Sequence, residues 1–222
     1  MPIIAESHVE EAALVWLAEL GYSIATGPTL APDGPAPERA HYGEVLLKGR
    51  LRAALARLNP TLPPEALVEA EAQLSFAQTP LLVEENRRLH RHLVEGVTLE
   101  VRRPDGTMAG EQVRFFDFDD PAGNDWLAVN QFAMVEGRAS RRPDIVVFAN
   151  GIPLAVIELK NPGDEDATLD GAFNQLRTYT GEITALFRTN LALVVSDGIS
   201  ARIGSLTSDR ERYMPWRSIP PA

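Results

Sequence analysis

Three charged residues occupy the ends of two adjacent apolar segments. Thirteen mostly apolar residues separate Asp144 from Glu158, and Lys160 follows two positions later. The turn pair Asn150-Gly151 lies between two runs rich in β-branched residues, and this pattern predicts a buried β-hairpin. Two carboxylates and an ammonium group at the open end of a hairpin suit the binding of a divalent cation and an attacking water beside a phosphodiester. The pattern favours nuclease chemistry.

The pair formed by Glu158 and Lys160 is weak support when taken alone, because most such pairs are exposed ion pairs at a strand end. Its position gives it more weight, since charged groups that end buried apolar strands are costly without a purpose. Strand periodicity directs both side chains to one face. Lys160 can then orient or help deprotonate a water and offset the charge that builds in the transition state.

The register of the hairpin decides whether this site can form. With a plain two-residue loop, Asp144 lies opposite Ile157, and Glu158 points to the other face of the sheet. An odd-length loop or a one-residue bulge sets Asp144 opposite Glu158. Pro153 cannot donate a ladder hydrogen bond, so it is a suitable place for such an irregularity. We predict a bulge there.

Polar residues on two predicted helices are further candidates. Gln175 and Tyr179 are four residues apart, so both project from one helix face and can reach the same phosphate or base. On spacing alone, a polar helix face with a tyrosine half-buried against the sheet is the better explanation. Glu10 lies on the flank of the first apolar stripe and is a candidate for a further metal-binding carboxylate. Glu6 and Glu11 are competing choices, and a solvated acidic surface is the commoner explanation for any one of them.

Composition limits the chemistry and the partners. The 222 residues are 45% hydrophobic, contain no cysteine and carry a formal net charge of -10. Disulfides and thiolate metal sites are excluded, so a metal ion needs oxygen or imidazole ligands. The sequence has no basic apolar leader and no apolar run of about 20 residues, which predicts a cytoplasmic protein without a membrane partner.

The negative charge predicts weak intrinsic affinity for nucleic acid, because that affinity depends largely on Lys and Arg. Arginines are nevertheless concentrated on either side of the candidate acids along the sequence. They are Arg138, Arg141, Arg142, Arg177, Arg188, Arg202, Arg210 and Arg212. An acidic domain with a basic site is expected where other domains supply most of the DNA binding.

Hydrophobic periodicity predicts a single α/β domain over residues 1–222, with a mixed sheet and helices on its faces. Residues 23–39 are rich in Pro, Gly and Ala, which predicts a surface loop. A helical insertion is expected at about 42–95 and a catalytic core at about 96–206. The predicted helices are 7–20, 42–58, 64–76, 79–93 and 169–187. The predicted strands, besides the hairpin of the candidate site, are 97–103, 112–118, 126–132, 191–196 and 200–203.

Four sequence motifs closely resemble the N-terminal nuclease region of type I restriction enzyme R subunits, and the likeness is most convincing from residue 126 to residue 216. The motifs are Arg141-Arg142-Pro143-Asp144, Val156-Ile157-Glu158-Leu159-Lys160-Asn161-Pro162, Phe173-Asn174-Gln175-Leu176-Arg177-Thr178-Tyr179 and Ser196-Asp197-Gly198.

The resemblance implies a nuclease of the PD-(D/E)XK superfamily. Asp144 and Glu158 would bind magnesium, and Lys160 would support the attacking water. Gln175 and Tyr179 would place DNA near the cleavage centre, with Arg142 as a further DNA-positioning candidate. Among the acids of the first helix, the resemblance favours Glu10 as an additional metal ligand.

In that family the R subunit continues into an ATP-driven translocase and assembles with modification and specificity subunits on double-stranded DNA. This sequence contains no phosphate loop of the form G-x-x-x-x-G-K-[ST], so we expect a fragment that ends before the motor, or a stand-alone relative. Cleavage would occur away from the recognition site, after translocation. The alternatives are a non-cutting docking module of the complex and a self-sufficient nuclease of another defence or repair system.

Overall fold

The computed structural model describes residues 6–102, 106–161 and 169–216. Its centre is a seven-stranded sheet with the strand order β1-β4-β7-β8-β9-β10-β11. The strands are β1 (Ser23–Thr26), β4 (Trp126–Asn130), β7 (Ile145–Ala149), β8 (Ile152–Leu159), β9 (Ala192–Ser196), β10 (Ala201–Gly204) and β11 (Met214–Pro215). Strand β1 is parallel to β4 and β8 is parallel to β9, whereas the other neighbours are antiparallel. The predicted mixed sheet is confirmed.

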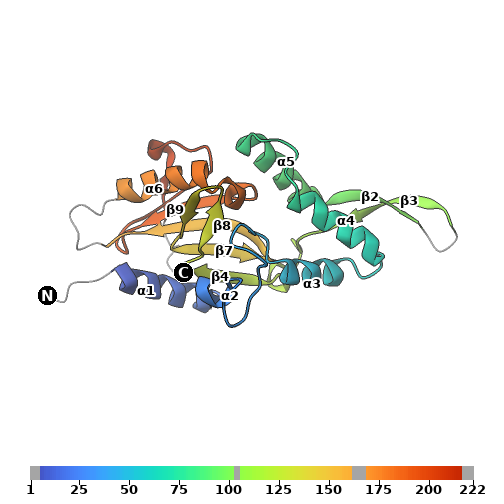
Figure 1. Cartoon of the computed structure of the whole chain (residues 1–222), viewed down its shortest axis with the longest axis horizontal. Coiled ribbons are helices and arrows are strands. Elements are labelled where there is room, and N and C mark those ends of the chain that lie inside the picture. The colour runs from blue at the N-terminus through green and yellow to red at the C-terminus, as the bar shows by residue number, and fades with distance from the viewer. Residues whose placement is uncertain (1–5, 103–105, 162–168, 217–222) are drawn as a thin grey trace.

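Two helices cover opposite faces of this sheet. Figure 1 places α6 (Leu169–Glu182) on one side of β7, β8 and β9 and α1 (Glu6–Glu19) on the other. All five residues of β7 are buried, as expected for a strand with apolar neighbours on both faces. Val146 and Val156 belong to the core under α6, whereas Ile145 and Ile157 belong to the core under α1. The sheet therefore separates two apolar layers. Membership of these layers shows which side chains of β7 and β8 face α6 and which face α1.

A helical region extends to one side of the sheet, with a two-stranded hairpin at its far end (Figure 1). Its helices are α3 (Lys48–Leu58), α4 (Pro64–Ser75) and α5 (Leu82–Glu95), and its strands are β2 (Val97–Arg102) and β3 (Met108–Val113). These elements share a separate apolar core, which also includes Ala149 at the end of β7 and Ile152 at the start of β8. The hairpin thus packs with the helical region, although the prediction grouped it with the catalytic core.

The predicted loop at 23–39 is wrong for its first part. Residues Ser23–Thr26 form β1 at the edge of the main sheet, and α2 (Gly27–Leu30) follows directly. The Thr26 hydroxyl accepts a hydrogen bond from the Thr29 backbone N–H and so caps α2. Strand β1 pairs in parallel with β4, about a hundred residues away, and local composition carries no sign of that pairing.

Several further boundaries differ from the prediction. The helix predicted at 42–58 begins only at Lys48. Strand β3 begins at Met108 rather than at 112, because Arg102 already pairs with Met108. The last long helix ends at Glu182, and a 3₁₀ turn, Thr184–Phe187, replaces its predicted end. Strand β4 ends at Asn130, because Gln131 has a left-handed backbone (φ +55°). A short hairpin follows, formed by β5 (Met134–Glu136) and β6 (Ala139–Arg141).

None of the helices in the described part of the chain combines the length and the apolar character that are needed to cross a membrane.

Candidate active site

A β-bulge sets the register of the hairpin that carries the predicted acids. Val147 pairs with Ala155, but Phe148 pairs with Pro153, so Leu154 is an extra residue in β8. Beyond the bulge, Ile145 pairs with Ile157, and continuation of this register by one residue sets Asp144 opposite Glu158. The predicted bulge is confirmed, next to Pro153.

Both acids are buried at the open end of the hairpin. Asp144 is 7% exposed and Glu158 is 0% exposed. The Asp144 Oδ2 atom accepts a hydrogen bond from the Leu159 backbone N–H at 2.8 Å, which ties the end of β7 to the end of β8. Glu158 is directed toward α6, because its neighbours Ile157 and Leu159 pack under α1. Two carboxylates are thus held close together on the α6 side of the sheet.

Lys160 joins this group from the same strand end. Its backbone N–H donates to the Ser196 carbonyl at 2.8 Å, which extends the pairing of β8 with β9. Its ammonium group donates to Glu158 Oε1 at 3.3 Å and to Gln175 Oε1 at 2.9 Å. Lys160 therefore links a carboxylate of the sheet to a polar side chain of α6.

The two predicted helix residues meet each other at the same place. Gln175 Nε2 donates to the Tyr179 hydroxyl at 2.6 Å, four residues along α6. Burial, together with the negative charges of Glu158 and Asp144, raises the pKa of Tyr179 to about 12. The hydroxyl keeps its proton at neutral pH, so it serves as a hydrogen-bonding group and not as a base.

Glu10 is not gathered with the other two acids. It lies on α1, and its carboxylate accepts hydrogen bonds from Asn130 Nδ2 at 2.6 Å and from Gln131 Nε2 at 2.5 Å. Within residues 6–102, 106–161 and 169–216, no three or more Asp, Glu, His or Cys side chains form a group that could hold a metal ion. Glu11, an alternative candidate for the metal-binding carboxylate, is exposed on α1. The side chain of Glu6, the other alternative, lies outside the described part of the structure.

The donor set that remains still fits magnesium. This ion is usually held in proteins by one or two carboxylates, and waters and substrate phosphates complete its shell. Asp144 and Glu158 supply two adjacent buried carboxylates at the sheet end, and carboxylate oxygens are the ligands that hard cations prefer. The geometry of Asp144 and Glu158 is compatible with a magnesium ion whose other ligands come from water and a bound phosphate.

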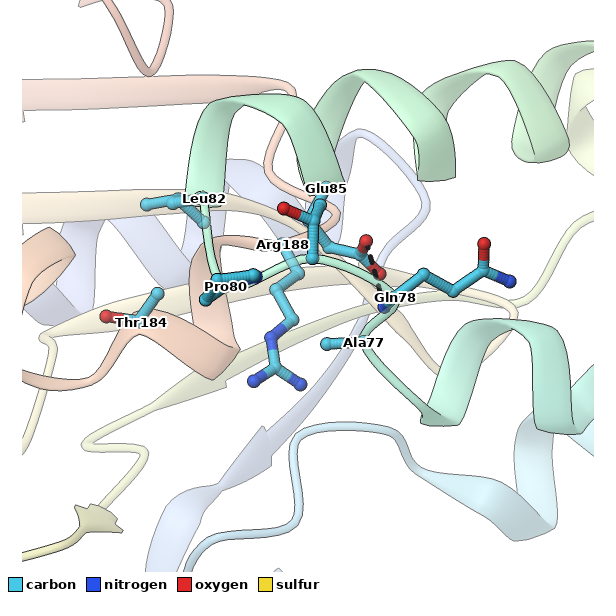
Figure 2. Close-up of a pocket in the computed structure, with 8 residues that line it drawn as sticks. Ala77, Gln78, Pro80, Leu82, Glu85, Thr184 and Arg188 are labelled. Carbon is cyan, nitrogen blue, oxygen red and sulfur yellow. Dashed lines mark hydrogen bonds between the residues drawn. The ribbon is translucent and has the colours of Figure 1, made fainter.

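The predicted basic residues do not all surround the acids. Arg142 is exposed and adjacent to the site in sequence, and the Arg141 guanidinium donates to Glu182 Oε2 at 2.5 Å. Arg188 is at the opposite end of β9, where it lines a cavity of about 300 Å³ together with Gln78, Pro80 and Glu85 (Figure 2). The predicted basic cluster is wrong for Arg188, because residues that flank a strand in sequence can lie at its two ends.

Two site residues were missing from the prediction. Asn130 and Gln131 connect Glu10 to the sheet, and the Gln131 backbone N–H also donates to the Asp144 carbonyl at 2.8 Å. Their partners are more than a hundred residues away on α1, so neither spacing nor periodicity could reveal the contacts. The available signal was weak: two adjacent amide side chains directly follow an apolar strand.

Comparison with known proteins places this arrangement in a family. The family described as the type I restriction enzyme R protein N terminus matches residues 3–212, and the chain belongs to it. The likeness therefore covers nearly the whole sequence, including all the residues of the candidate site.

Individual relatives agree with this assignment. The chain is 37% identical over 218 residues, 98% of its length, to the type I restriction enzyme HindI endonuclease subunit of Haemophilus influenzae. It is 35% identical over 214 residues to the putative type I restriction enzyme MjaIXP endonuclease subunit of Methanocaldococcus jannaschii. These matches cover 21% and 20% of the two relatives, so the chain spans about a fifth of their length.

Proposed function

We propose that this chain is the magnesium-dependent DNA endonuclease region of a type I restriction enzyme R subunit, with a PD-(D/E)XK nuclease fold. The bulge at Leu154 carries the proposal, because it brings Asp144 beside Glu158 and so creates the site. The family match supports the restriction role. The mixed sheet, with α1 and α6 on its two faces and the acids on adjacent strands, supports the fold assignment.

Asp144 and Glu158 would hold the magnesium ion. When it is bound, the ion supplies positive charge at the phosphodiester and makes water more acidic. Lys160 has three N–H donors, and among the described residues it donates to Glu158 and Gln175. A further N–H of this ammonium group would donate to an attacking water or to a phosphate oxygen, and its charge would offset negative charge that develops during cleavage.

Gln175 and Tyr179 serve this centre from α6. Gln175 receives a hydrogen bond from Lys160 and donates one to Tyr179, so it fixes the ammonium group relative to the helix. The protonated Tyr179 hydroxyl can donate to a DNA phosphate, because its pKa of about 12 keeps it neutral. Exposed Arg142 adds a positive charge next to Asp144 for the DNA backbone.

The proposed role in the whole enzyme follows from charge. A net charge of -10 makes independent DNA binding weak, so the chain depends on DNA-bound neighbours for local concentration. We assign that function to an ATP-driven motor of the R subunit and to the modification and specificity subunits. Double-stranded DNA would be cut away from the recognition site after translocation.

The test uses the complete restriction complex with ATP, Mg²⁺ and supercoiled DNA that contains a recognition site. Asp144→Ala and Lys160→Ala are expected to abolish nicking, whereas complex assembly and ATP hydrolysis stay at the parent level. Retention of ATP hydrolysis shows that the variants fold and assemble. If both variants cut DNA as fast as the parent, the proposal is wrong, and a docking role for the chain is the better explanation.

A further inference from the structure

The contacts of Glu10 extend from α1 to the candidate site. Each of its carboxylate oxygens accepts a short hydrogen bond, one from Asn130 Nδ2 at 2.6 Å and one from Gln131 Nε2 at 2.5 Å. Hydrogen bonds to a carboxylate are about twice as strong as those between neutral groups. The end of β4 is therefore attached to α1 through two charge-assisted bonds.

Gln131 bonds in a second direction as well. Its backbone N–H donates to the carbonyl of Asp144 at 2.8 Å, while its side chain reaches Glu10. Gln131 has φ +55°, and within the described residues only Asn150 is another non-glycine residue with positive φ. Such a conformation costs about 1 kcal/mol or more and persists only where the surroundings fix it. Strain of this kind at a candidate active site points to a functional constraint.

The surroundings of Gln131 do fix its backbone. A Cβ atom on Gly27 would lie 2.1 Å from the Gln131 carbonyl oxygen, so the start of α2 packs backbone to backbone against this turn. The two residues after Gln131 are held by the buried Arg39. Its guanidinium lies 3.9 Å from the Phe132 ring centroid and donates to the Ala133 carbonyl at 2.9 Å. The turn after β4 is thus held by α1, by α2 and by the buried guanidinium.

The position of Glu10 on the sheet argues against direct metal binding. Asn130 pairs with Ile145, whose side chain belongs to the core under α1. Asp144 precedes Ile145 and is opposite Glu158, so alternation directs both acids toward α6. Glu10 reaches the strand end from the α1 side, and its contact with Asp144 runs through Gln131.

We infer that Glu10 and Gln131 are positioning residues that fix Asp144 beside Glu158, with Glu10 acting through Gln131. Gln131 holds the backbone of Asp144, and the Leu159 N–H holds its carboxylate. The inference rests on the proposed function, because it assigns Asp144 as a metal ligand. It replaces the predicted ligand role of Glu10 with an indirect one.

Exchanging the side chains at positions 10 and 131 distinguishes indirect positioning by Glu10 from direct metal binding. In Glu10→Gln, the amide oxygen still accepts from Asn130, and Gln131 can turn its own amide to receive a hydrogen bond. Gln131→Glu instead places two carboxylates against each other. In the double variant Glu10→Gln/Gln131→Glu, position 10 donates to position 131 and accepts from Asn130, so both hydrogen bonds return. The matched control is Glu11→Gln, an exposed acid on the same helix.

The readout is the affinity of the full chain for Mn²⁺, measured by calorimetry, together with the unfolding midpoint. Indirect positioning predicts a loss of a few-fold for Glu10→Gln and of about 10- to 100-fold for Glu10→Ala and Gln131→Glu. The double variant is expected to regain the affinity of Glu10→Gln. A merely structural role would shift the unfolding midpoints without changing the Mn²⁺ affinity of the folded protein, and that result would contradict the inference.

The outcomes distinguish this inference from the proposed function. If Glu10→Gln loses as much affinity as Glu10→Ala and the double variant is not rescued, Glu10 is a direct ligand and the inference is wrong. If Asp144→Ala binds Mn²⁺ as tightly as the parent, the proposed metal site itself fails. Loss of binding in Asp144→Ala with normal binding in Gln131→Glu overturns the positioning role alone.

Discussion

The two ends of the β7–β8 hairpin both bury polar side chains, but they do so in different ways. At the turn, Asn150 is 0% exposed and has φ +51°. Its Nδ2 donates to the Phe115 carbonyl and to Asn124 Oδ1, both at 2.8 Å, and its Oδ1 accepts from the Asp125 N–H at 2.8 Å. Each end of the amide is satisfied by groups that belong to the turn and its neighbours.

At the open end, like charges are brought together instead. Asp144 and Glu158 are both buried, and in the described part of the chain the Lys160 ammonium group is hydrogen-bonded to Glu158. A buried amide with complementary partners stabilises a fold, whereas adjacent buried carboxylates repel each other unless a cation joins them. Burial of a polar residue is therefore no sign of function by itself. The charge balance of its partners separates the structural end of this hairpin from the candidate active end.

Neutralising an acid at the open end should have the largest effect on activity and the opposite effect on stability. Asp144→Asn keeps an oxygen that can accept from the Leu159 N–H, but it removes a charge. We expect DNA nicking by the full complex to fall on the order of 10³-fold. Relief of repulsion should raise the free energy of unfolding by about 1 kcal/mol, measured by urea denaturation without metal. A clear loss of stability would show that the two ends do not differ as described.

The corresponding change at the turn should affect stability alone. Asn150→Ala removes the partner of four backbone or side-chain groups, so the free energy of unfolding should fall by about 3 kcal/mol. Mn²⁺ affinity of the protein that remains folded should equal that of the parent. Asn174→Ala, at an exposed position of α6, is the control and should change stability by less than about 0.5 kcal/mol. Weakened metal binding in folded Asn150→Ala would mean that the ends are coupled.

A smaller effect is expected from the helix that faces the open end. Tyr179→Phe removes the hydroxyl that accepts from Gln175, and about a tenfold loss of cleavage should follow. Because the pKa of Tyr179 is about 12, its proton is not lost during cleavage near neutral pH. The cleavage rates of variant and parent should keep a constant ratio from pH 7 to pH 9. A ratio that changes with pH would assign a proton-transfer role to this tyrosine.

The smallest effect concerns a tyrosine outside both ends. Burial raises the pKa of Tyr213 from 10.0 to about 12, so folding favours its protonated form. That contribution to stability is fully present below pH 10 and is lost as the pH rises toward 12. Tyr213→Phe should flatten the decline in unfolding free energy over this window, as followed by denaturation at several pH values. An unchanged decline would show that other groups control alkaline unfolding.

The candidate site was predictable to the extent that its chemistry is local. Glu158 and Lys160 are two residues apart at one strand end. The odd number of residues between Asp144 and Glu158 required an irregularity in the hairpin, and Pro153 indicated where a bulge would form. The roles of Asn130 and Gln131 were not predictable, because they depend on contacts with α1 across more than a hundred residues.

The same limit applies to the fold. Apolar periodicity identified α1, α4 and α5 to within a few residues, because it is a property of each segment. Strand β1 was missed, since its four residues carry a weak pattern and gain stability from distant β4. The partner of the hairpin β2–β3 was also misjudged. Its strands were visible in the sequence, but nothing local indicates whether a hairpin joins the main sheet or packs on α4.

The extra residue Leu154 has a consequence for comparing sequences of this kind. Deletion of Leu154 would leave a regular hairpin with a two-residue turn, in which Asp144 stays opposite Glu158. With all thirteen residues kept and no bulge, Asp144 would instead lie opposite Ile157, and Glu158 and Lys160 would point toward α1, away from Gln175. The number of residues that separate the two acids, odd or even, therefore indicates whether the hairpin needs an irregularity to form the site. A relative that keeps both acids with an even number of residues between them is expected to have a plain two-residue turn and no bulge.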